Sequence, residues 1–229
     1  MSKIIDVIIP AYNEEESIGL VLKDIPEGLV RQVVVANNNS SDQTAEIAKK
    51  EGAKVVFESE QGYGAACLKA IDFSLRTQPP PDILVFLDAD YSDHPEEMTK
   101  VLQPILAGEV ELVIGSRALG QREKGSMMPQ QIFGNRLATT LMRWMYGSTF
   151  TDLGPFRAIT TRAYREIGMC DRNFGWTVEM QVKALKKKVS HTEVPVTYRR
   201  RKGVSKVSGT IKGSILAGYK IIYTIFKYA

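Results

Sequence analysis

The segment 83–90 constrains the fold more than any other stretch of this sequence. It reads Ile-Leu-Val-Phe-Leu and then Asp88, Ala89 and Asp90, so an apolar run ends directly in two carboxylates. An unbroken apolar run of this kind is typical of a strand buried on both faces, as in a parallel sheet covered by helices. Ligands of open α/β sheets bind outside the carboxyl ends of the strands, so we expect the two acids at a binding edge.

Asp88 and Asp90 offer hard oxygen donors at a spacing that suits a divalent cation. Mg²⁺ or Mn²⁺ bound there would keep coordination positions for the phosphate oxygens of a substrate. The alternative is that these residues cap the helix predicted to begin near Pro95, because Asp is a favoured N-cap residue. The pattern fits both interpretations equally, so polar residues elsewhere in the chain must decide between them.

Apolar runs alternate with segments of helical periodicity through the first half of the chain. Pro10 is expected to end the first strand, because proline cannot donate to a sheet ladder. The β-α-β order predicts an α/β fold, with a Rossmann-like, mostly parallel sheet and flanking helices. Strands are expected at 4–9, 33–35, 54–57, 83–87 and 111–115, with helices after 14–16, at 42–50, from 61–66 and at 94–106.

Polar residues follow four of these predicted strands. One such ending is ordinary loop chemistry, but four that meet at the same edge of a parallel sheet indicate a site. We therefore favour the metal site over the helix cap. The four endings are Tyr12 and Glu14, Asn37 to Asn39, Asp88 and Asp90, and Ser116 and Arg117.

The second half of the chain is patterned less regularly. Residues 118–131 contain Gly, Arg, Lys, Ser and two Met without periodicity, which predicts a mobile loop. A helix is expected over 133–146, in which Leu137, Leu141 and Trp144 have the spacing of a core-facing stripe. Further on, 152–157 is expected to lead from a turn into a strand, 174–180 to begin a helix, and 191–198 to form an edge strand.

Composition limits the functional classes. The 229 residues include 30 Lys and Arg against 26 Asp and Glu, and the net charge of +4 is too mild to imply a nucleic-acid partner. The two cysteines, Cys67 and Cys170, predict core thiols in a reducing cytoplasm rather than a disulfide framework. His94 and His191 are expected to be solvated rather than to bind metal. We expect neither a signal peptide nor a bilayer-spanning segment, since no run of 18 uncharged apolar residues occurs.

Basic residues are concentrated near the C-terminus. Residues 199–202 and Lys206 precede 211–228, in which Ile, Leu, Tyr and Phe are interleaved with lysines. This pattern predicts an amphipathic helix able to lie in a membrane interface and to meet anionic lipid. The alternative is a last helix that packs on the domain and keeps its lysines solvated.

Seven short motifs carry a likeness to a known family. They are Pro-Ala-Tyr-Asn-Glu at 10–14, Asp-Gln-Thr at 42–44, Gly-Tyr-Gly-Ala-Ala at 62–66, the stretch 88–95, Gly-Ser-Arg at 115–117, and the segments 152–157 and 201–206. In this order they resemble the family-2 inverting glycosyltransferases with the GT-A fold. The most similar branch contains the dolichol- and polyprenol-phosphate mannose or glucose synthases. The likeness covers roughly residues 4–210, and the ordered set is far more specific than any single motif.

The resemblance implies a metal-dependent transfer of a sugar from a nucleotide-diphosphate sugar. It implies a domain at 1–207, in which 1–117 binds the nucleotide sugar and 118–207 the acceptor, followed by the amphipathic helix at 208–229. Asp88 and Asp90 would hold Mg²⁺ or Mn²⁺, with Asp90 as the direct ligand.

The same resemblance assigns the remaining site residues. Nucleotide-sugar contacts are implied for Pro10, Ala11, Tyr12, Glu14, Asn37, Asn38, Gly62 and Ala89. Acceptor or phosphate contacts are implied for Arg117, Arg157, Arg201, Ser205 and Lys206, and catalytic roles for Asp88, Asp90, Arg117 and Glu179.

One departure from the family pattern concerns the base of the nucleotide. Many members carry two Asp after the second strand, and this chain carries Asn37 and Asn38. An amide oxygen can still accept a hydrogen bond from the imide N–H of the base, but its NH₂ group adds donors. The choice between UDP and GDP is therefore open.

The acceptor decides whether a general base is needed. A polyprenyl or dolichyl phosphate at the cytoplasmic face of a membrane is our favoured acceptor, and as an anion it needs none. A sugar or other hydroxyl would need a base, for which Glu179 is the candidate, although it could simply be a first-turn helix acid. Asp152 is expected to cap a turn and support Arg157.

Two other classes of protein share part of this pattern. A nucleotidyltransferase usually has a Gly-rich loop bearing Lys or Arg after the first strand, and the turn at 10–14 lacks one. A non-catalytic nucleotide-sugar-binding protein would lack the acid pair or the basic residues proposed to hold phosphate. Both are present, the latter as Arg117, Arg201 and Lys206. The identity of the sugar, dimerisation, and a peripheral membrane contact or membrane-protein partner stay open.

Overall fold

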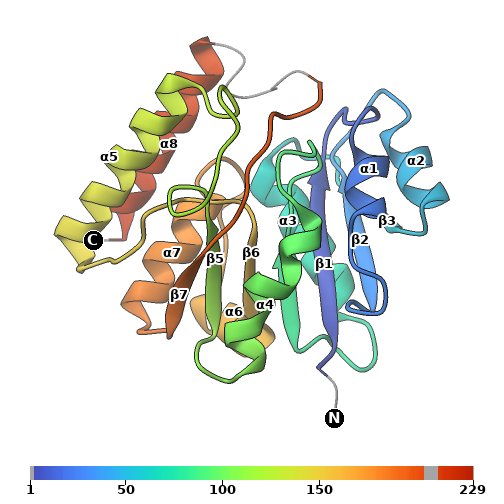
Figure 1. Ribbon diagram of the computed structural model, residues 1–229, viewed down its shortest axis with the longest axis horizontal. Helices are drawn as coiled ribbons and strands as arrows, with labels where there is room; N and C mark the ends of the chain where they lie inside the picture. The colour runs from blue at the N-terminus through green and yellow to red at the C-terminus, as the bar shows by residue number, and fades with distance from the viewer. Residues whose placement is uncertain (1–2, 204–210, 229) are drawn as a thin grey trace.

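The structure is a computed structural model that describes residues 3–203 and 211–228. Its strands are β1 (Ile5–Ala11), β2 (Gln32–Asn37), β3 (Lys54–Phe57), β4 (Ile83–Phe86), β5 (Leu112–Ser116), β6 (Arg157–Thr160) and β7 (His191–Pro195). They form one seven-stranded sheet in the order β3-β2-β1-β4-β6-β5-β7 (Figure 1). β6 runs antiparallel to its neighbours β4 and β5, whereas the other pairs are parallel. The predicted α/β class is confirmed.

Helices cover both faces of the sheet (Figure 1). One face carries α1 (Ile18–Lys23), α2 (Thr44–Lys50), the short 3₁₀ helix η1 (Pro95–Glu97) and α4 (Met98–Leu106). The other carries α3 (Tyr63–Leu75), α5 (Pro129–Tyr146), α6 (Thr161–Ile167), α7 (Trp176–Lys186) and α8 (Ile211–Lys227).

The central strand β4 explains the apolar run before the acid pair. It is buried along its whole length, between β1 and β6. Leu84 and Phe86 belong to the core beneath α3 and α7, while Ile83 and Val85 belong to the core on the opposite face. This alternation is the two-residue period of a strand covered on both sides. Asp88 therefore lies just beyond the carboxyl end of this strand.

Several predicted boundaries differ from the structure, and two of them have a clear physical reason. Pro10 does not end the first strand, which continues to Ala11 opposite Asn37 of β2. The ladder with β4 stops at Ile8, so the missing N–H of Pro10 costs no bond on that side. α5 begins at Pro129 rather than at residue 133, with proline in the first turn, where its lack of an N–H is harmless. The short helix α6 was not predicted.

The apolar stripe assigned to α5 does not face the core. Trp144 is 85% exposed and Leu137 40% exposed. The buried side chains of α5 are instead Ala138 and Met142, one position further along, and Leu141 only borders the core. The two cysteines also differ, because Cys67 is buried as predicted and Cys170 is exposed. Helical spacing identified a stripe but not the face that the neighbouring helices cover.

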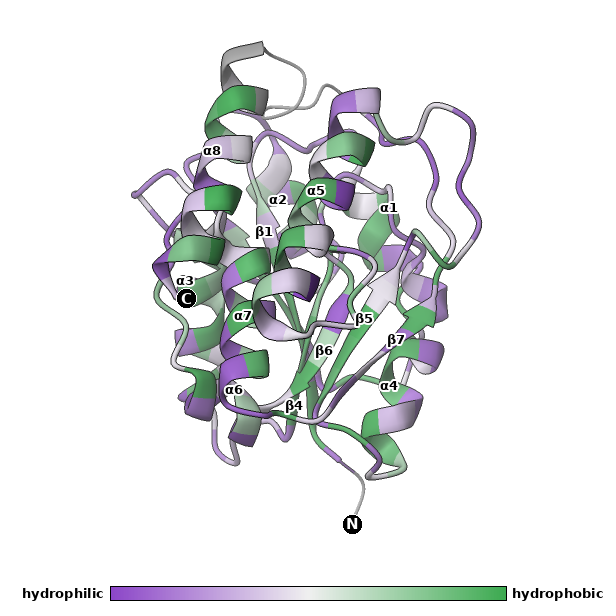
Figure 2. Ribbon diagram, turned by 90° about the vertical axis from the view of Figure 1, so that its left-hand side faces the viewer, coloured by the Kyte–Doolittle hydropathy of each residue, from purple (hydrophilic) through white to green (hydrophobic). Residues whose placement is uncertain are grey.

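The last helix, α8, lies beside α5 and packs on α7 (Figures 1 and 2). Its Thr224 and Ile225 are buried, and Tyr146 Oη donates to the carbonyl of Ile225 at 2.5 Å. Five other side chains of α8 are large, apolar and exposed, namely Ile215, Leu216, Tyr219, Tyr223 and Phe226. Within the described part of the chain, no helix combines the length and apolarity needed to cross a bilayer.

Candidate active site at the carboxyl edge of the sheet

Asp88 and Asp90 lie in the turn that follows β4. Tyr63 Oη, from the first residue of α3, donates to Asp88 Oδ1 at 2.9 Å. Asp90 Oδ1 accepts hydrogen bonds from the backbone N–H of Ser92 at 3.0 Å and from the Ser92 hydroxyl. Tyr91, between them, has a φ of 63°, so the turn is tight. Asp88 Oδ2 and Asp90 Oδ2 take no part in these hydrogen bonds.

Arg201 contacts two other predicted site residues, Glu14 and Asp90, which come from distant parts of the chain. Its Nη2 donates to Glu14 Oε1 at 2.7 Å, and its Nη1 lies 3.1 Å from Asp90 Oδ2. The neighbouring Lys202 N–H donates to the Asp90 carbonyl at 3.0 Å. The segment after β7 therefore folds over the acid pair.

A third acid, Asp93, lies near this pair and was not singled out from the sequence. It is 2% exposed, and neither carboxylate oxygen has a hydrogen-bond partner among the described side chains and backbone groups. Burial, followed by the charges of Asp88 and Asp90, raises the pKa of Asp93 well above its usual range. Burial and the charge of Asp90 likewise raise the pKa of Asp88 to about 7. The only sequence signal for Asp93 was its place three residues after Asp90.

These residues fit a divalent cation that also binds its substrate. Among the residues described, no three His, Cys, Asp or Glu side chains form a ready metal cage. Mg²⁺ usually needs none, since it takes one or two carboxylates and completes its shell with water and substrate phosphates. Raised pKa values in neighbouring acids indicate uncompensated negative charge, which a bound cation would stabilise.

Arg117 does not have a free guanidinium. Its backbone N–H and Nε donate to Asp152 Oδ2 at 2.7 and 2.8 Å, and its Nη2 donates to Asp152 Oδ1 at 2.7 Å. Burial would raise the pKa of Asp152, but the charge and hydrogen bonds of Arg117 lower it. The Arg117 guanidinium also lies over the ring of Tyr198, with 5.0 Å between the guanidinium carbon and the ring centroid. Asp152 therefore supports chiefly Arg117 rather than Arg157.

Arg157 does not offer its donors to a ligand, contrary to the role implied for it. The side chain is 1% exposed, and its guanidinium donates to the backbone carbonyls of Leu153, Gly154 and Thr177. Burial lowers its pKa to about 10. It therefore ties the 153–154 turn to α7.

Most of the residues predicted to hold the nucleotide lie at the ends of β1 and β2, but the side chain of Asn38 is already saturated. Asn38 donates to the carbonyls of Glu58 and Glu60 and accepts from Gly62 N–H at 2.8 Å. Asn37, whose Oδ1 accepts from Ser40 N–H at 3.0 Å, and the 37% exposed Tyr12 remain as candidate nucleotide contacts. Pro10, Ala11 and Ala89 are buried and shape the site through their backbone.

Close packing of α3 against the 171–172 backbone explains the glycine at position 62. Its N–H is taken by Asn38, and a Cβ at this position would lie 2.1 Å from the carbonyl oxygen of Arg172. Gly64 meets the Asp171 carbonyl in the same way, at 2.1 Å. The two glycines let α3 approach the 171–172 backbone, and the N–H of Gly62 is not available for the nucleotide-sugar contact implied for this residue.

Glu179 is also misplaced as a catalytic base. It is 0% exposed, and its carboxylate accepts from the N–H groups of Cys170 and Asp171, from the Cys170 thiol and from Tyr228 Oη. Lys183 Nζ lies 2.8 Å away. Despite burial, these hydrogen bonds lower its pKa to about 2. A carboxylate held this way is a poor proton acceptor at neutral pH and serves to fasten α8 to α7.

Ser205 and Lys206 lie outside the described residues, so their predicted phosphate contacts stay predictions. Ser116, the other residue at the fifth strand end, shares a hydrogen bond of 2.8 Å with Thr151 Oγ1. The structure thus gathers Glu14, Asp88, Asp90 and Arg201 at one edge, adds Tyr63 and Asp93, and assigns Arg157, Asn38, Gly62 and Glu179 to the scaffold.

Residues 6–168 match the protein family described as Glycosyl transferase family 2. An uncharacterized glycosyltransferase of Mycobacterium tuberculosis is 34% identical over 218 residues, which cover 93% of this chain and 94% of the relative. A dolichyl-phosphate hexose transferase of Haloferax volcanii is 31% identical, with 92% of this chain and 89% of the relative covered. A polyprenol monophosphomannose synthase of Mycolicibacterium smegmatis is 29% identical, with 89% and 81% covered.

A solved structure shares the fold. It is the glucosyl-3-phosphoglycerate synthase of M. tuberculosis in complex with Mn²⁺, uridine diphosphate and glucosyl-3-phosphoglycerate. The TM-score is 0.78 at 21% identity, and the likeness covers 99% of this chain and 80% of the synthase.

Proposed function

The chain belongs to glycosyl transferase family 2 and has the GT-A fold, and from that premise we propose that it transfers a sugar from a nucleotide-diphosphate sugar to a polyprenyl or dolichyl phosphate. In this reaction a bond forms between a phosphate oxygen of the acceptor and the anomeric carbon. The bond from that carbon to the diphosphate breaks, and the nucleoside diphosphate leaves with the electron pair. Attack from the opposite face inverts the anomeric carbon.

The observation that carries the lipid acceptor is the apolar surface of the two helices α5 and α8. Phe133 and Trp144 on α5 are 69% and 85% exposed, and Ile215 and Tyr219 on α8 are 65% and 67% exposed. Large apolar side chains scattered singly on a surface mean little, but two adjacent helices that both expose them indicate contact with a membrane or partner. The two relatives that are named for polyprenol and dolichyl phosphates support the same acceptor.

Asp88 and Asp90 would hold Mg²⁺ or Mn²⁺. When bound, the cation stabilises the negative charge that develops on the leaving diphosphate. Arg201, which lies between Glu14 and Asp90, would bind a phosphate oxygen by a charge-assisted hydrogen bond. Tyr12 and Asn37 remain candidates for the nucleoside. Ser205 and Lys206 are proposed to complete the phosphate contacts.

A phosphate acceptor fits the surroundings of Glu179 better than a hydroxyl acceptor does. The acceptor phosphate is an anion at neutral pH and needs no proton removed before it attacks. The only base candidate from the sequence is saturated and has a pKa of about 2. We therefore propose a transfer without a protein general base.

The membrane contact is proposed to be peripheral, on the cytoplasmic face. The exposed apolar side chains of α5 and α8 would enter the interface, with Arg143 and Lys227 facing anionic headgroups. The buried residues Thr224 and Ile225 keep α8 attached to the domain at the same time. The two interpretations of this helix are thus compatible.

A transfer assay tests the proposal. Purified protein with Mn²⁺ or Mg²⁺ is given a panel of UDP- and GDP-sugars, with farnesyl phosphate, with farnesol, or with no acceptor. Product that forms with farnesyl phosphate alone supports the lipid-phosphate acceptor and names the donor. Donor consumption that is equal in all three conditions would overturn it.

A further inference from the structure

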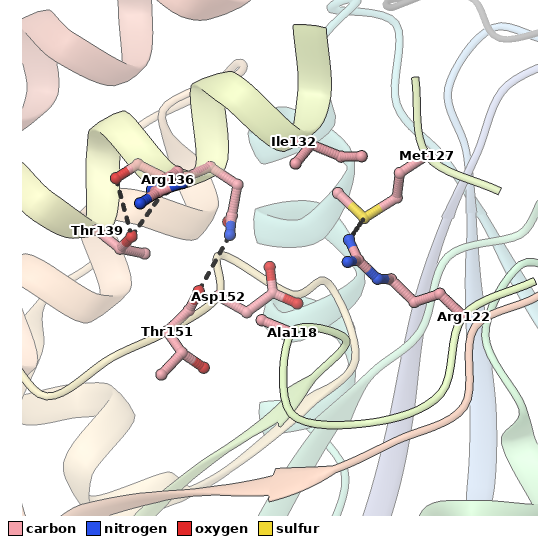
Figure 3. A pocket seen from close by; sticks show the side chains of 9 residues that line it. Ala118, Arg122, Met127, Ile132, Arg136, Thr139, Thr151 and Asp152 are labelled. Atoms are coloured by element: carbon pink, nitrogen blue, oxygen red, sulfur yellow. Dashed lines mark hydrogen bonds between the residues drawn. The ribbon is translucent and has the colours of Figure 1, made fainter. Parts of the chain in front are cut away.

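A cavity lies on the acceptor side of the site, between the 117–128 loop and the first turns of α5. Its volume is about 200 Å³, and its walls include the side chains of Arg122, Met127, Ile132, Arg136 and Asp152 (Figure 3). Loop and helix contribute one arginine each. Neither arginine belongs to the motifs that resemble the glycosyltransferase family.

Arg122 and Arg136 line the cavity and have no acidic partner among the described residues. Arg122 makes one weak contact, from Nη1 to Met127 Sδ at 3.4 Å. Neither arginine forms an ion pair with any acid in the described ranges, 3–203 and 211–228. By contrast, Arg117 and Arg157, which the sequence suggested for the acceptor, are committed to Asp152 and to backbone carbonyls.

The single acid in the cavity wall does not oppose an anion. Asp152 is 1% exposed, and both of its oxygens accept from Arg117. That ion pair leaves the cavity with the positive charge of Arg122 and Arg136. A guanidinium can bind two phosphate oxygens at once, so two of them suit a phosphomonoester dianion.

The frame of the cavity is fixed by hydrogen bonds. Asn135 Nδ2 donates to the Thr151 carbonyl at 3.1 Å, and its Oδ1 accepts from Leu153 N–H at 2.9 Å. Thr151 N–H and hydroxyl donate to Glu193 of β7 at 2.9 and 2.8 Å. A cavity built in this way is preformed, which lowers the cost of binding.

Apolar side chains connect the cavity with the exposed face of α5. Ile132 lines the cavity and is 44% exposed, and Phe133 and Leu137 continue outward along the helix. On the inner side, Asp152 of the cavity wall is paired with Arg117, the residue that follows β5. An anion in the cavity would thus lie beside this ion pair at the carboxyl edge of the sheet, and Ile132 would offer it an apolar wall.

We propose that Arg122 and Arg136 form the binding subsite for the phosphomonoester of the acceptor, and that Ile132 and Phe133 guide its hydrocarbon chain. This inference rests on the proposed function, because it names the residues that recognise its acceptor. The same phosphate chemistry occurs in lipid phosphates and in small soluble phosphomonoesters. The hydrocarbon path distinguishes the two, and the experiment compares them.

The test measures transfer kinetics with farnesyl phosphate and with glycerol 1-phosphate for the wild type, Arg122→Gln and Arg136→Gln. Loss of a charge-assisted hydrogen bond is expected to raise the KM for farnesyl phosphate by roughly tenfold to a hundredfold. The KM for the nucleotide sugar is expected to stay unchanged. Arg165→Gln, on an exposed position of α6, is the matched control and is expected to behave as the wild type.

A Phe133→Ser variant separates the lipid from the soluble source. It is expected to raise the KM for farnesyl phosphate and to leave any reaction with glycerol 1-phosphate unaffected. Preference of the wild type for glycerol 1-phosphate would overturn the lipid assignment. Wild-type acceptor kinetics in both arginine variants, or an equal rise in the donor KM, would overturn the subsite.

Direct binding keeps this inference separable from the proposed function. Titration calorimetry follows farnesyl phosphate and wild-type or variant protein without a sugar donor. If the wild type transfers to no phosphate, the proposed function fails, and calorimetry alone then decides the subsite. Binding that both arginine variants lose supports the subsite, and binding that both retain overturns it.

Discussion

Arg201 Nη1 lies 3.1 Å from Asp90 Oδ2, so a guanidinium already compensates the carboxylate that is proposed to hold the metal. A divalent cation that binds Asp90 must compete with this ion pair. The same arginine also holds Glu14 at 2.7 Å, which gives it an alternative partner at the nucleotide side of the site. Metal binding and the position of Arg201 are therefore coupled.

Removal of Arg201 is expected to strengthen metal binding and weaken catalysis. In Arg201→Ala, the Kd for Mn²⁺ without nucleotide should fall a few-fold, because a partly exposed ion pair is worth up to about 1 kcal/mol. Transfer should nevertheless slow, since a phosphate contact is lost. Electron paramagnetic resonance of free Mn²⁺ measures the first effect. Arg200→Ala, next in the chain and exposed, is the control. Weaker Mn²⁺ binding in Arg201→Ala would show that the arginine does not compete.

Substitution of the metal carboxylate is expected to remove metal-dependent turnover and keep the fold. Asp90→Asn can still accept from Ser92, so the turn should persist. We expect kcat to fall by roughly a hundredfold or more, because Lewis-acid stabilisation is worth several kcal/mol. Initial rates against Mn²⁺ concentration and a thermal melt measure both effects. Glu109→Gln, which is exposed, serves as the control. Full metal-dependent activity in Asp90→Asn would remove the metal role.

Glu179 is expected to matter for stability and not for chemistry. Glu179→Gln loses a buried carboxylate that faces Lys183 and Tyr228, so the free energy of unfolding should fall by about 3 kcal/mol. Its kcat with farnesyl phosphate should stay within about twofold of the wild type at temperatures where the variant is folded. Denaturant unfolding and initial rates provide the two measurements. A large loss of kcat without a loss of stability would restore Glu179 as a base.

The same residue predicts how stability depends on pH. The pKa of Glu179 is lowered in the folded protein from about 4.5 to about 2, so its contribution is fully present above pH 4.5. Stability should be lost as pH falls from about 4.5 toward 2, because the unfolded chain takes up the proton first. In Glu179→Gln this part of the pH dependence should disappear. A variant with the wild-type acid profile would contradict the assignment.

The sequence predicted most of the sheet because buried strands leave a direct signal. The run before Asp88 predicted the central strand, since residues covered on both faces must all be apolar. The polar strand endings likewise predicted the edge at which Glu14, Asp90 and Arg201 meet. These inferences needed only chain order and the direction of parallel strands.

What the sequence could not show is which polar groups are already paired. Arg157 and Asn38 have the residue types of ligand contacts, but tertiary structure directs them to backbone carbonyls. Gly62 was predicted to contact the nucleotide sugar, but a glycine is needed here because the Arg172 carbonyl lies close to it. Trp144 was assigned to the core, although α7 and α8 cover a neighbouring face of its helix. These outcomes depend on helix rotation or on a partner 20 or more residues away, such as Thr177 for Arg157 and Glu60 for Asn38.

Exposed aromatic residues on α5 and α8 should determine membrane binding. A Phe133→Ser and Trp144→Ser double variant removes two large apolar side chains that are 69% and 85% exposed, so the fold should tolerate it. Each such side chain contributes about 1.5–3 kcal/mol when buried, so the partition coefficient should fall by at least roughly a hundredfold. Cosedimentation with vesicles of phosphatidylcholine and phosphatidylglycerol measures the partitioning. Phe57→Ser on β3, 56% exposed at the far edge of the sheet, is the control and should bind as the wild type does. Equal binding by all three proteins would show that α5 does not meet the bilayer.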